Sequence, residues 1–275
     1  MSAIDMLEVG NPLEKKPKIF VGIALDRSGS MESIASSVIS NYNEQIGDIF
    51  QRSGKADLKV FLVSFASDVQ VHYINANVDN LVKLTKKTYC PDGNTCMFEG
   101  MGVLVDSIVE ATKDLDDYSV LLVTVSDGEN NQSHDKYTAT YVRDKIKELQ
   151  DGKKWTFVFI GATKDKVLIE EELGISRMNV ANFVAGNIRS YNTTSRHLAT
   201  AAANYLDTSI KVAGLGPDAS PVMNNMCFFA GEDVQSENTD EIVSDPIDDS
   251  LINDPGISLV KKQFSVGSLD NKWRK

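Results

Sequence analysis

Cysteine is scarce in this sequence, which excludes one class of architecture. The chain of 275 residues contains three cysteines, Cys90, Cys96 and Cys227, too few for a small fold held together by disulfides. Cys90 and Cys96 flank the sequence PDGNT and could close a small loop, but in a reducing compartment both are expected to be free thiols. The fold must therefore rely on a hydrophobic core, for which a 42% share of hydrophobic residues is sufficient.

Long apolar runs and an excess of positive charge are also missing. No stretch of about 18 apolar residues occurs, and the N-terminal sequence MSAIDMLEVGNPLEKKPK lacks the apolar region of a signal peptide. We therefore expect a soluble, cytoplasmic protein that does not act at a membrane. The formal net charge of -11 and a pI near 4.8 argue against a nucleic-acid partner, because proteins that bind phosphate backbones carry basic patches.

The common catalytic motifs are absent as well. The chain has no Walker-type glycine-rich lysine loop and no G-x-S-x-G elbow, and His72 and His197 have no neighbouring pattern for zinc. His134 follows SDGENNQS closely enough to act as a general base beside a metal, although a lone histidine on a polar loop is usually just solvated. One function that the sequence leaves open, as an alternative to a non-enzymatic role, is that of a metal-dependent hydrolase or phosphotransfer enzyme that uses Asp26 and His134. A nucleophilic Asp26 would, however, require a second carboxylate where Ser28 stands.

Composition divides the chain into three parts. Residues 1–16 are predicted to be a flexible lead-in, residues 17–210 an α/β domain, and residues 211–275 an acidic, loosely structured tail or arm. Residues 232–254 contain nine acidic residues and no Lys or Arg, so they cannot bury enough apolar surface to offset their ordering entropy. The apolar sequence MCFFAG (226–231) fits a last strand, or a segment packed back on the domain, better than a partner-docking motif.

Buried strands alternate with amphipathic helices within the predicted domain. Apolar runs such as KIFVGIAL and WTFVFIG indicate strands buried on both faces, whereas VQVHYI alternates like an edge strand after a turn. This order predicts an α/β, doubly wound sheet that is mostly parallel, with one antiparallel edge strand and flanking helices. The expected strands are 18–25, 57–65, 69–74, 118–126, 155–161 and 179–184, and the expected helices are about 32–52, 97–115, 136–149, a short one ending at Gly174, and 188–206.

Oxygen-bearing side chains follow the first predicted strand. Asp26, Ser28 and Ser30 alternate in LDRSGSM, so a turning loop could aim them at a common point. In an open parallel sheet such a loop lies at the carboxyl edge, where ligands bind, and Asp127 ends a later strand at the same edge. An all-oxygen cluster suits a hard divalent cation. A simpler interpretation is that Asp26, Ser28 and Ser30 only cap the next helix. Thr95, just before the helix expected at 97–115, fits a helix N-cap as well as a metal ligand.

Three motifs in this order resemble the metal motifs of a von Willebrand factor type A (vWA) domain. They are DRSGSM after the first strand, the threonine of YCPDGNTCMFEGM before a helix, and SDG after a later strand. The resemblance covers about residues 17–207 and extends, through TYCPDGNT, WTFVFIGATKDK and EELGI, to a group of small bacterial and bacteriophage vWA proteins. Their loop more often reads Y-x-P-R-G-x-T-A-L-L-D-A, so Asp92 and Glu99 depart from the pattern at positions that could bear on partner choice.

The resemblance implies a Rossmann-like fold with a metal-ion-dependent adhesion site for Mg²⁺, at which Mn²⁺ can substitute. It implies that Ser28 and Ser30 bind the cation directly and Thr95 directly or through water. Asp26 and Asp127 are implied to act mainly through water or by accepting hydrogen bonds from the groups that bind the cation. Mostly neutral ligands leave the cation electrophilic, with a position for a carboxylate from outside. The implied function is a non-enzymatic, cation-dependent protein–protein interaction. The expected partner presents an acidic residue, as part of an ATPase complex, a stress-response assembly or a virion.

Overall fold

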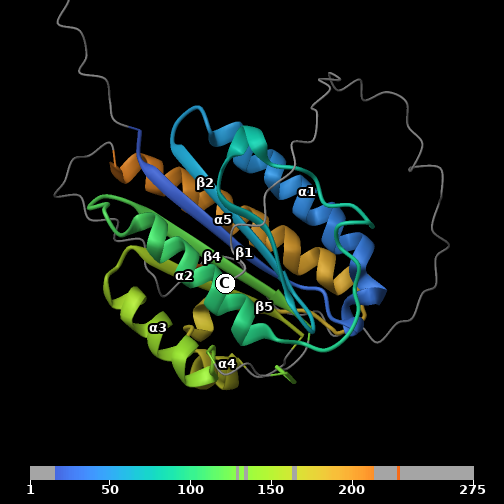
Figure 1. The fold of residues 1–275 in the computed structure, drawn as a ribbon. Helices are drawn as coiled ribbons and strands as arrows, with labels where there is room; N and C mark the ends of the chain where they lie inside the picture. Colours follow the sequence, from blue (N-terminus) through green and yellow to red (C-terminus); the bar gives the residue numbers. More distant parts are fainter. Residues whose placement is uncertain (1–15, 128–129, 133–135, 163–165, 214–227, 230–275) are drawn as a thin grey trace, which may run out of the picture. The chain divides into compact units, whose positions relative to one another are not determined.

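Six strands form one mostly parallel sheet in the order β3-β2-β1-β4-β5-β6. The computed structural model describes residues 16–127, 130–132, 136–162, 166–213 and 228–229. Only β3, at one edge, runs antiparallel to its neighbour (Figure 1). The predicted fold class, a doubly wound and mostly parallel sheet with one antiparallel edge strand, is confirmed. The strands are β1 (Lys18–Asp26), β2 (Asp57–Phe65), β3 (Val69–Asn77), β4 (Ser119–Ser126), β5 (Trp155–Gly161) and β6 (Val180–Asn182).

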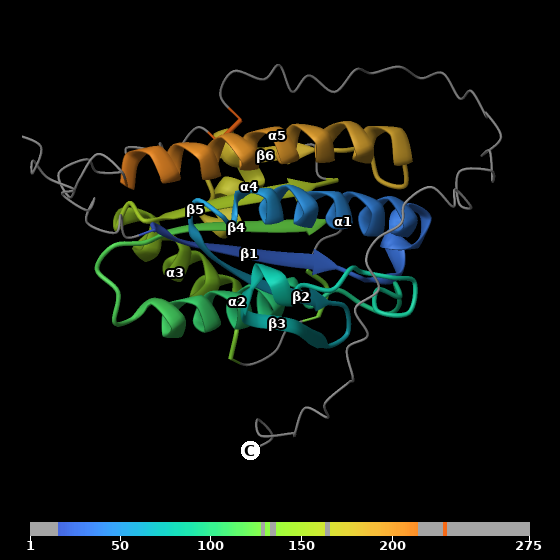
Figure 2. The same ribbon diagram turned by 90° about the horizontal axis from the view of Figure 1, so that it is seen from above.

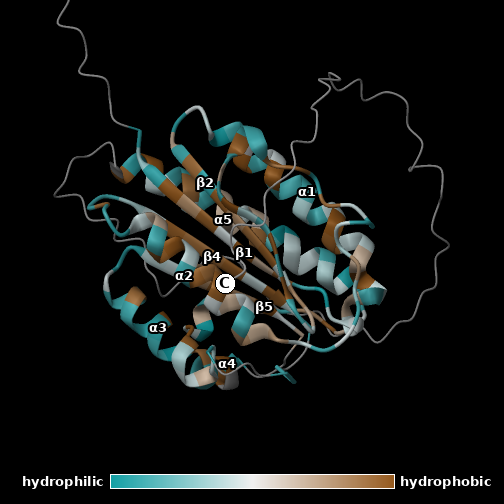
Figure 3. Cartoon of the chain, viewed as in Figure 1, coloured by the Kyte–Doolittle hydropathy of each residue, from teal (hydrophilic) through white to brown (hydrophobic). Residues whose placement is uncertain are grey.

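Helices cover both faces of the sheet. Figure 2 shows α1 and α5 on one side and α2 and α3 on the other, and α4 contributes to the same core cluster as α2 and α3. The apolar residues concentrate on the strands, while much of the helix surface is hydrophilic (Figure 3). The helices are α1 (Ala35–Arg52), α2 (Met97–Thr112), α3 (Ala139–Asp151), α4 (Lys166–Leu173) and α5 (Ile188–Ala213), with short 3-10 turns η1 (Gly29–Ile34), η2 (Val78–Asn80) and η3 (Arg177–Asn179).

The central strand β1 shows why the sheet is buried on both sides. Successive side chains of a strand point to opposite faces. Ile19 and Ile23 therefore belong to the core under α1 and α5, whereas Phe20 and Ala24 belong to the core under α2 and α3. A continuous apolar run satisfies both cores at once.

Several elements differ in length from the prediction. The edge strand β3 continues to Asn77, beyond the expected end at 74, because its pairing with β2 shifts register and Asn75 adopts a positive φ of 52°. The last strand keeps only Val180–Asn182 of the expected 179–184. Helix α5 runs to Ala213 instead of 206, since no proline or glycine interrupts the sequence before Gly214.

Two residues of the apolar sequence MCFFAG are described, and both lie on the domain. Phe229 is buried, and the Phe228 amide donates a hydrogen bond to Oδ1 of Asn179 over 2.8 Å. This agrees with a segment packed back on the domain. The lead-in 1–15 and residues 230–275 lie outside the described residues, so the tail boundary stays a prediction.

Among the described helices, none is both long enough and apolar enough to cross a membrane. Cys90 and Cys96 are free; Cys90 is exposed and Cys96 is buried. Burial raises the pKa of the Cys96 thiol to about 11, so this thiol is protonated at neutral pH.

Candidate metal centre

The carboxylate of Asp26 lies where the two central strands end. Asp26 is the last residue of β1 and Ser126 the last of β4, and these strands pair in parallel. The Ser126 hydroxyl donates to Oδ2 of Asp26 over 2.5 Å, and the Ser28 amide donates to Oδ1 over 2.7 Å. Both carboxylate oxygens are thereby held in place at the carboxyl edge of the sheet.

Asp26 is fully buried, and its burial has an electrostatic cost. Desolvation raises the pKa of Asp26, the hydrogen bonds from Ser126 and Ser28 oppose that rise, and the nearby charge of Asp127 adds to it. No salt bridge between described residues involves Asp26 or Asp127. The adjacent arginine, Arg27, pairs with Asp68 instead. Among the described residues, no cationic side chain forms an ion pair with the negative charge of this site.

A row of side-chain oxygens continues from the first loop to the loop after β4. Oγ of Ser28 lies 3.0 Å from Oγ of Ser30, and the Ser30 hydroxyl donates to Oδ1 of Asp127 over 2.6 Å. Oxygens that share an octahedral cation with bonds of about 2.0–2.1 Å lie about 2.9 Å apart along an edge of the octahedron. The observed distances are those of ordinary O–H···O hydrogen bonds, and they are also close to this edge length, so the row is compatible with one small divalent cation.

Helix capping does not account for the first loop. Ser28 occupies the N-cap position of η1, yet its side chain makes no capping hydrogen bond. Its hydroxyl faces Ser30 instead. The simpler interpretation offered by the sequence, that these residues only cap a helix, therefore does not explain where the Ser28 hydroxyl points.

The first loop is fastened to the loop that precedes α2. The Tyr89 hydroxyl donates a hydrogen bond to the backbone carbonyl of Asp26. The Gly29 amide donates to the Gly93 carbonyl over 3.1 Å, and the Asp92 amide donates to the Arg27 carbonyl over 2.8 Å. These bonds bring the segment that contains Thr95 beside the segment that contains the serines.

Gly93 is suited to this close approach for two reasons. Its φ of +73° is in the left-handed region, and a Cβ there would lie 2.4 Å from Oγ of Ser67. A side chain at this position would displace either the loop or Ser67.

Thr95 is buried just before α2, but it is not the N-cap. That position belongs to Cys96, whose side chain makes no capping hydrogen bond. The Thr95 amide donates to Oδ1 of Asn131 over 2.8 Å, and the Thr95 carbonyl accepts from the amides of Asn131 and Gln132 at 3.1 and 3.2 Å. All three bonds use the backbone of Thr95 and not its hydroxyl.

Hydrogen bonds thus link four of the five predicted metal residues. The backbone amide of Ser28 donates to Asp26, and side-chain bonds join Ser28 to Ser30 and Ser30 to Asp127. The backbone of Thr95 hydrogen-bonds to Asn131 and Gln132, which follow Asp127 in the loop after β4, and not to these four residues. Within the described residues no group of three or more His, Cys, Asp or Glu side chains forms a metal cluster, so a cation here would depend on hydroxyl ligands. That donor set is the kind that Mg²⁺ and Mn²⁺ accept.

Sequence reasoning missed several residues that build this site. Ser126, Tyr89 and the run Asn130–Gln132 hold the predicted ligands in place. A serine directly before Asp127 and a polar NNQ run directly after the SDGE sequence were available signals. Neither identifies its partner, because the partners lie far away in the chain.

The histidines offer no second metal site among the described residues. Nε2 of His72 lies 2.9 Å from the Ser64 hydroxyl, and His197 is on α5. His134, the base in the alternative hydrolase, and Gly128 of the SDG motif lie outside the described residues.

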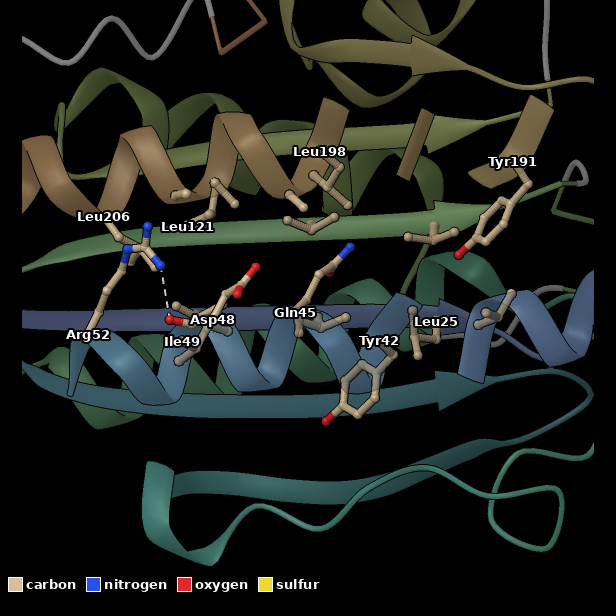
Figure 4. A pocket seen from close by; sticks show the side chains of 18 residues that line it. Leu25, Tyr42, Gln45, Asp48, Ile49, Arg52, Leu121, Tyr191, Leu198 and Leu206 are labelled. Carbon is tan, nitrogen blue, oxygen red and sulfur yellow. Dashed lines mark hydrogen bonds between the residues drawn. The ribbon is translucent and has the colours of Figure 1, made fainter. Parts of the chain in front are cut away.

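A cavity of about 50 Å³ lies on the other side of β1 and β4 from α2, between α1 and α5 (Figure 4). Apolar side chains such as Leu25, Leu121 and Leu198 line it, and Arg52 at one end donates to the Asp48 carbonyl over 3.0 Å. A volume of this size holds a few water molecules but no drug-sized ligand. The cavity is therefore not an alternative candidate for the functional site.

Comparisons with known proteins identify similar folds at low sequence identity. No protein-family model and no curated protein sequence matches the chain. The pilus adhesin SpaC from Lactobacillus rhamnosus GG is 11% identical, with 71% of this chain and 31% of that chain covered and a TM-score of 0.50. The minor pilin PilB from Streptococcus sanguinis is 15% identical, with 71% and 64% covered and a TM-score of 0.49. A von Willebrand factor type A protein from Catenulispora acidiphila is 11% identical, with 68% and 43% covered and a TM-score of 0.44.

These matches concern the fold alone. The chain spans 64% of PilB, 43% of the Catenulispora protein and 31% of SpaC, less than two thirds of each.

Proposed function

We propose that this chain, which has the von Willebrand factor type A fold, is a non-enzymatic interaction module that binds a protein partner through a divalent cation. Mg²⁺, or Mn²⁺ in its place, is held by Ser28, Ser30 and Thr95, with Asp26 and Asp127 supplying the negative charge. The partner presents a carboxylate. The cytoplasmic location expected from the sequence is part of the same proposal.

The observation that carries the proposal is the row of oxygens from Ser28 through Ser30 to Asp127, beside a buried Asp26 that forms no ion pair with a described residue. A buried carboxylate is costly unless it is paired or near a metal. A divalent cation would relieve that cost and would replace the hydrogen bonds among the hydroxyls with direct contacts.

The charge of the site explains why an acidic partner is favoured. The two aspartates balance a divalent cation, but hydroxyl oxygens are weak donors to it. A bound Mg²⁺ would supply an electrophilic centre for one more oxygen ligand. A carboxylate from a partner is a stronger ligand than water, so the partner's acidic side chain completes the coordination.

Metal titration tests the first half of the proposal. Isothermal titration calorimetry of the full chain should detect Mg²⁺ and Mn²⁺ binding, and Ser30→Ala should weaken it about tenfold or more, since a ligand is lost. Ca²⁺ should bind less well, because its longer bonds and higher coordination number suit this compact cluster poorly. Ser36→Ala, an exposed serine of α1 close in sequence, is the matched control and should bind Mg²⁺ as the wild type does. Absence of heat from the wild-type chain with either metal would refute the metal site.

Partner binding tests the second half. Affinity capture in Mg²⁺ and in chelator should recover the partner only in Mg²⁺. The purified partner should then bind Thr95→Ala more weakly than the wild type in Mg²⁺, and substitution of one acidic residue in the partner should have the same effect. Equal partner affinity in Mg²⁺ and in chelator would place docking on another face even if the site binds metal.

A further inference from the structure

We infer that Asn131 is a positioning residue that sets the place of Thr95 in the metal site. The inference rests on the proposed function and adds a residue that the metal motifs do not include. Asn131 and Thr95 exchange two hydrogen bonds: the Thr95 amide donates to Oδ1 of Asn131 over 2.8 Å, and the Asn131 amide donates to the Thr95 carbonyl over 3.1 Å. Two bonds in opposite directions fix both the distance and the rotation of the Thr95 backbone.

The need for such a residue follows from where Thr95 lies. It stands between a turn and the first residue of α2, Met97, and so belongs to no regular element. The next residue, Cys96, is tied by its amide to the Ala66 carbonyl over 2.8 Å. Thr95 itself is aligned by the loop after β4 through Asn131 and Gln132.

The residues on either side of Asn131 fasten the same loop to two other segments. Oδ1 of Asn130 accepts from the Phe98 amide over 3.2 Å and thereby caps the first turn of α2, whose amide groups lack intrahelical partners. Nε2 of Gln132 donates to the Ser67 carbonyl over 2.9 Å, and Oγ of Ser67 accepts from the Asn94 amide over 2.9 Å. Nδ2 of Asn94 also donates to Oε1 of Gln132 over 3.4 Å, so the loop after β4 contacts residues on both sides of Thr95.

Asp127 lies four positions before Asn131 in this same loop. One loop thus supplies a carboxylate to the site and also positions the hydroxyl that a different loop supplies. Groups that orient metal ligands without touching the metal typically change metal affinity by about 10- to 100-fold when they are removed. Asn131 is exposed, so a smaller side chain there leaves no buried cavity.

The test uses Asn131→Ala and Asn131→Asp in the full chain. Asn131→Ala removes the acceptor of the Thr95 amide and should weaken Mg²⁺ binding about tenfold in calorimetry. Asn131→Asp keeps that acceptor and should bind Mg²⁺ at least as tightly as the wild type does. Because the added charge could by itself favour the cation, amide hydrogen exchange is measured in parallel. The Thr95 amide should exchange slowly in the wild type and in Asn131→Asp, and rapidly in Asn131→Ala.

Asn43 provides a control, since it also holds the backbone of a residue in another segment by two hydrogen bonds in opposite directions, both of them made by its side chain. Its Oδ1 accepts from the Leu84 amide over 2.8 Å and its Nδ2 donates to the Leu84 carbonyl over 3.0 Å, in the middle of α1. Asn43→Ala should lower the melting temperature but leave Mg²⁺ affinity unchanged.

The possible results separate this inference from the proposed function. Wild-type Mg²⁺ affinity in Asn131→Ala would overturn the inference alone, as would an equal loss of affinity in Asn43→Ala, which would indicate general destabilisation. A wild-type chain that binds neither Mg²⁺ nor Mn²⁺ would overturn the proposed function and the inference with it.

Discussion

The Ser30 hydroxyl donates a hydrogen bond to Oδ1 of Asp127 over 2.6 Å, although the two residues are 97 positions apart. The bond joins the loop after β1 to the loop after β4, and these strands are neighbours in the sheet. Its two oxygens belong to the residues that the proposed function assigns to one cation. Changes at either end should therefore affect metal binding before they affect the fold.

Asp127→Asn should weaken Mg²⁺ binding about tenfold or more. The amide keeps an oxygen that can accept from Ser30, but it removes one negative charge beside the cation. Asp79→Asn, at an exposed position in η2, makes the same change of charge elsewhere and should have little effect. Calorimetry of both variants checks this, and equal affinities would show that Asp127 does not contribute to the site.

Asp26→Asn should abolish Mg²⁺ binding and leave the metal-free protein as stable as the wild type, to within about 1 kcal/mol. Burial opposes the charged form of Asp26, so a neutral amide of the same shape removes a cost. The amide oxygen can still accept from the Ser28 amide, and the Ser126 hydroxyl can rotate to accept from the new amide. Denaturant unfolding in chelator measures the stability. A loss of several kcal/mol would show that the carboxylate is required for the fold itself.

Gly102→Ala and Gly47→Ala should change stability in opposite directions. A Cβ at Gly102 of α2 would lie 2.1 Å from the Tyr137 ring, so overpacking should cost about 1–3 kcal/mol. Gly47 lies inside α1 with nothing within 4 Å of a Cβ, so alanine should stabilise by about 0.5–1 kcal/mol. Denaturant unfolding of both variants measures the difference, and two changes of the same sign would contradict the packing described between α2 and Tyr137.

The stability of the wild type should decrease on mild acidification relative to His72→Gln. Burial, and then the positive charge of Arg27, lower the pKa of His72 below its ordinary value. A lowered folded-state pKa means that the unfolded chain takes up the proton first. The contribution of His72 is therefore complete above pH of about 6.5 and is lost as pH falls through the folded-state pKa.

Glutamine is the control because it cannot titrate and can still hydrogen-bond to Ser64, which His72 contacts over 2.9 Å. Unfolding free energies of the two proteins, measured from pH 8 to about pH 5, give the difference directly. A difference that is independent of pH would mean that His72 has the same pKa in both states.

Local patterns in the sequence were sufficient to predict the fold. Runs such as KIFVGIAL in β1 and WTFVFIG in β5 have the length and the β-branched and aromatic content typical of strands buried on both faces, and they form such strands. The ends of elements were less accurate. Asn75 lets β3 continue through a local change of register, and nothing in a pattern of alternating residues anticipates that change.

The candidate site was predicted only in part. The types and spacing of Asp26, Ser28 and Ser30 indicate oxygen ligands on one loop, the strand pattern places Asp127 at the same edge of the sheet, and the resemblance assigned Thr95 and Asp127 to the same cation. The N-cap role considered for Thr95 was wrong, since Cys96 occupies that position. Helix termini are set by backbone hydrogen bonds to other segments as well as by the local sequence.

By itself, the sequence determined the order of strands and helices, the edge of the sheet at which the oxygen-bearing side chains gather, and the types of residue present there. These are properties of short segments, set by hydrophobic periodicity and by the chemistry of single side chains. Only the tertiary structure decided which oxygens meet and what holds them. Ser30 reaches Asp127, and Asn131 aligns Thr95, because neighbouring strands bring distant loops together. Hydrogen bonds between residues far apart in the chain depend on that arrangement, and the local sequence contains no record of their partners.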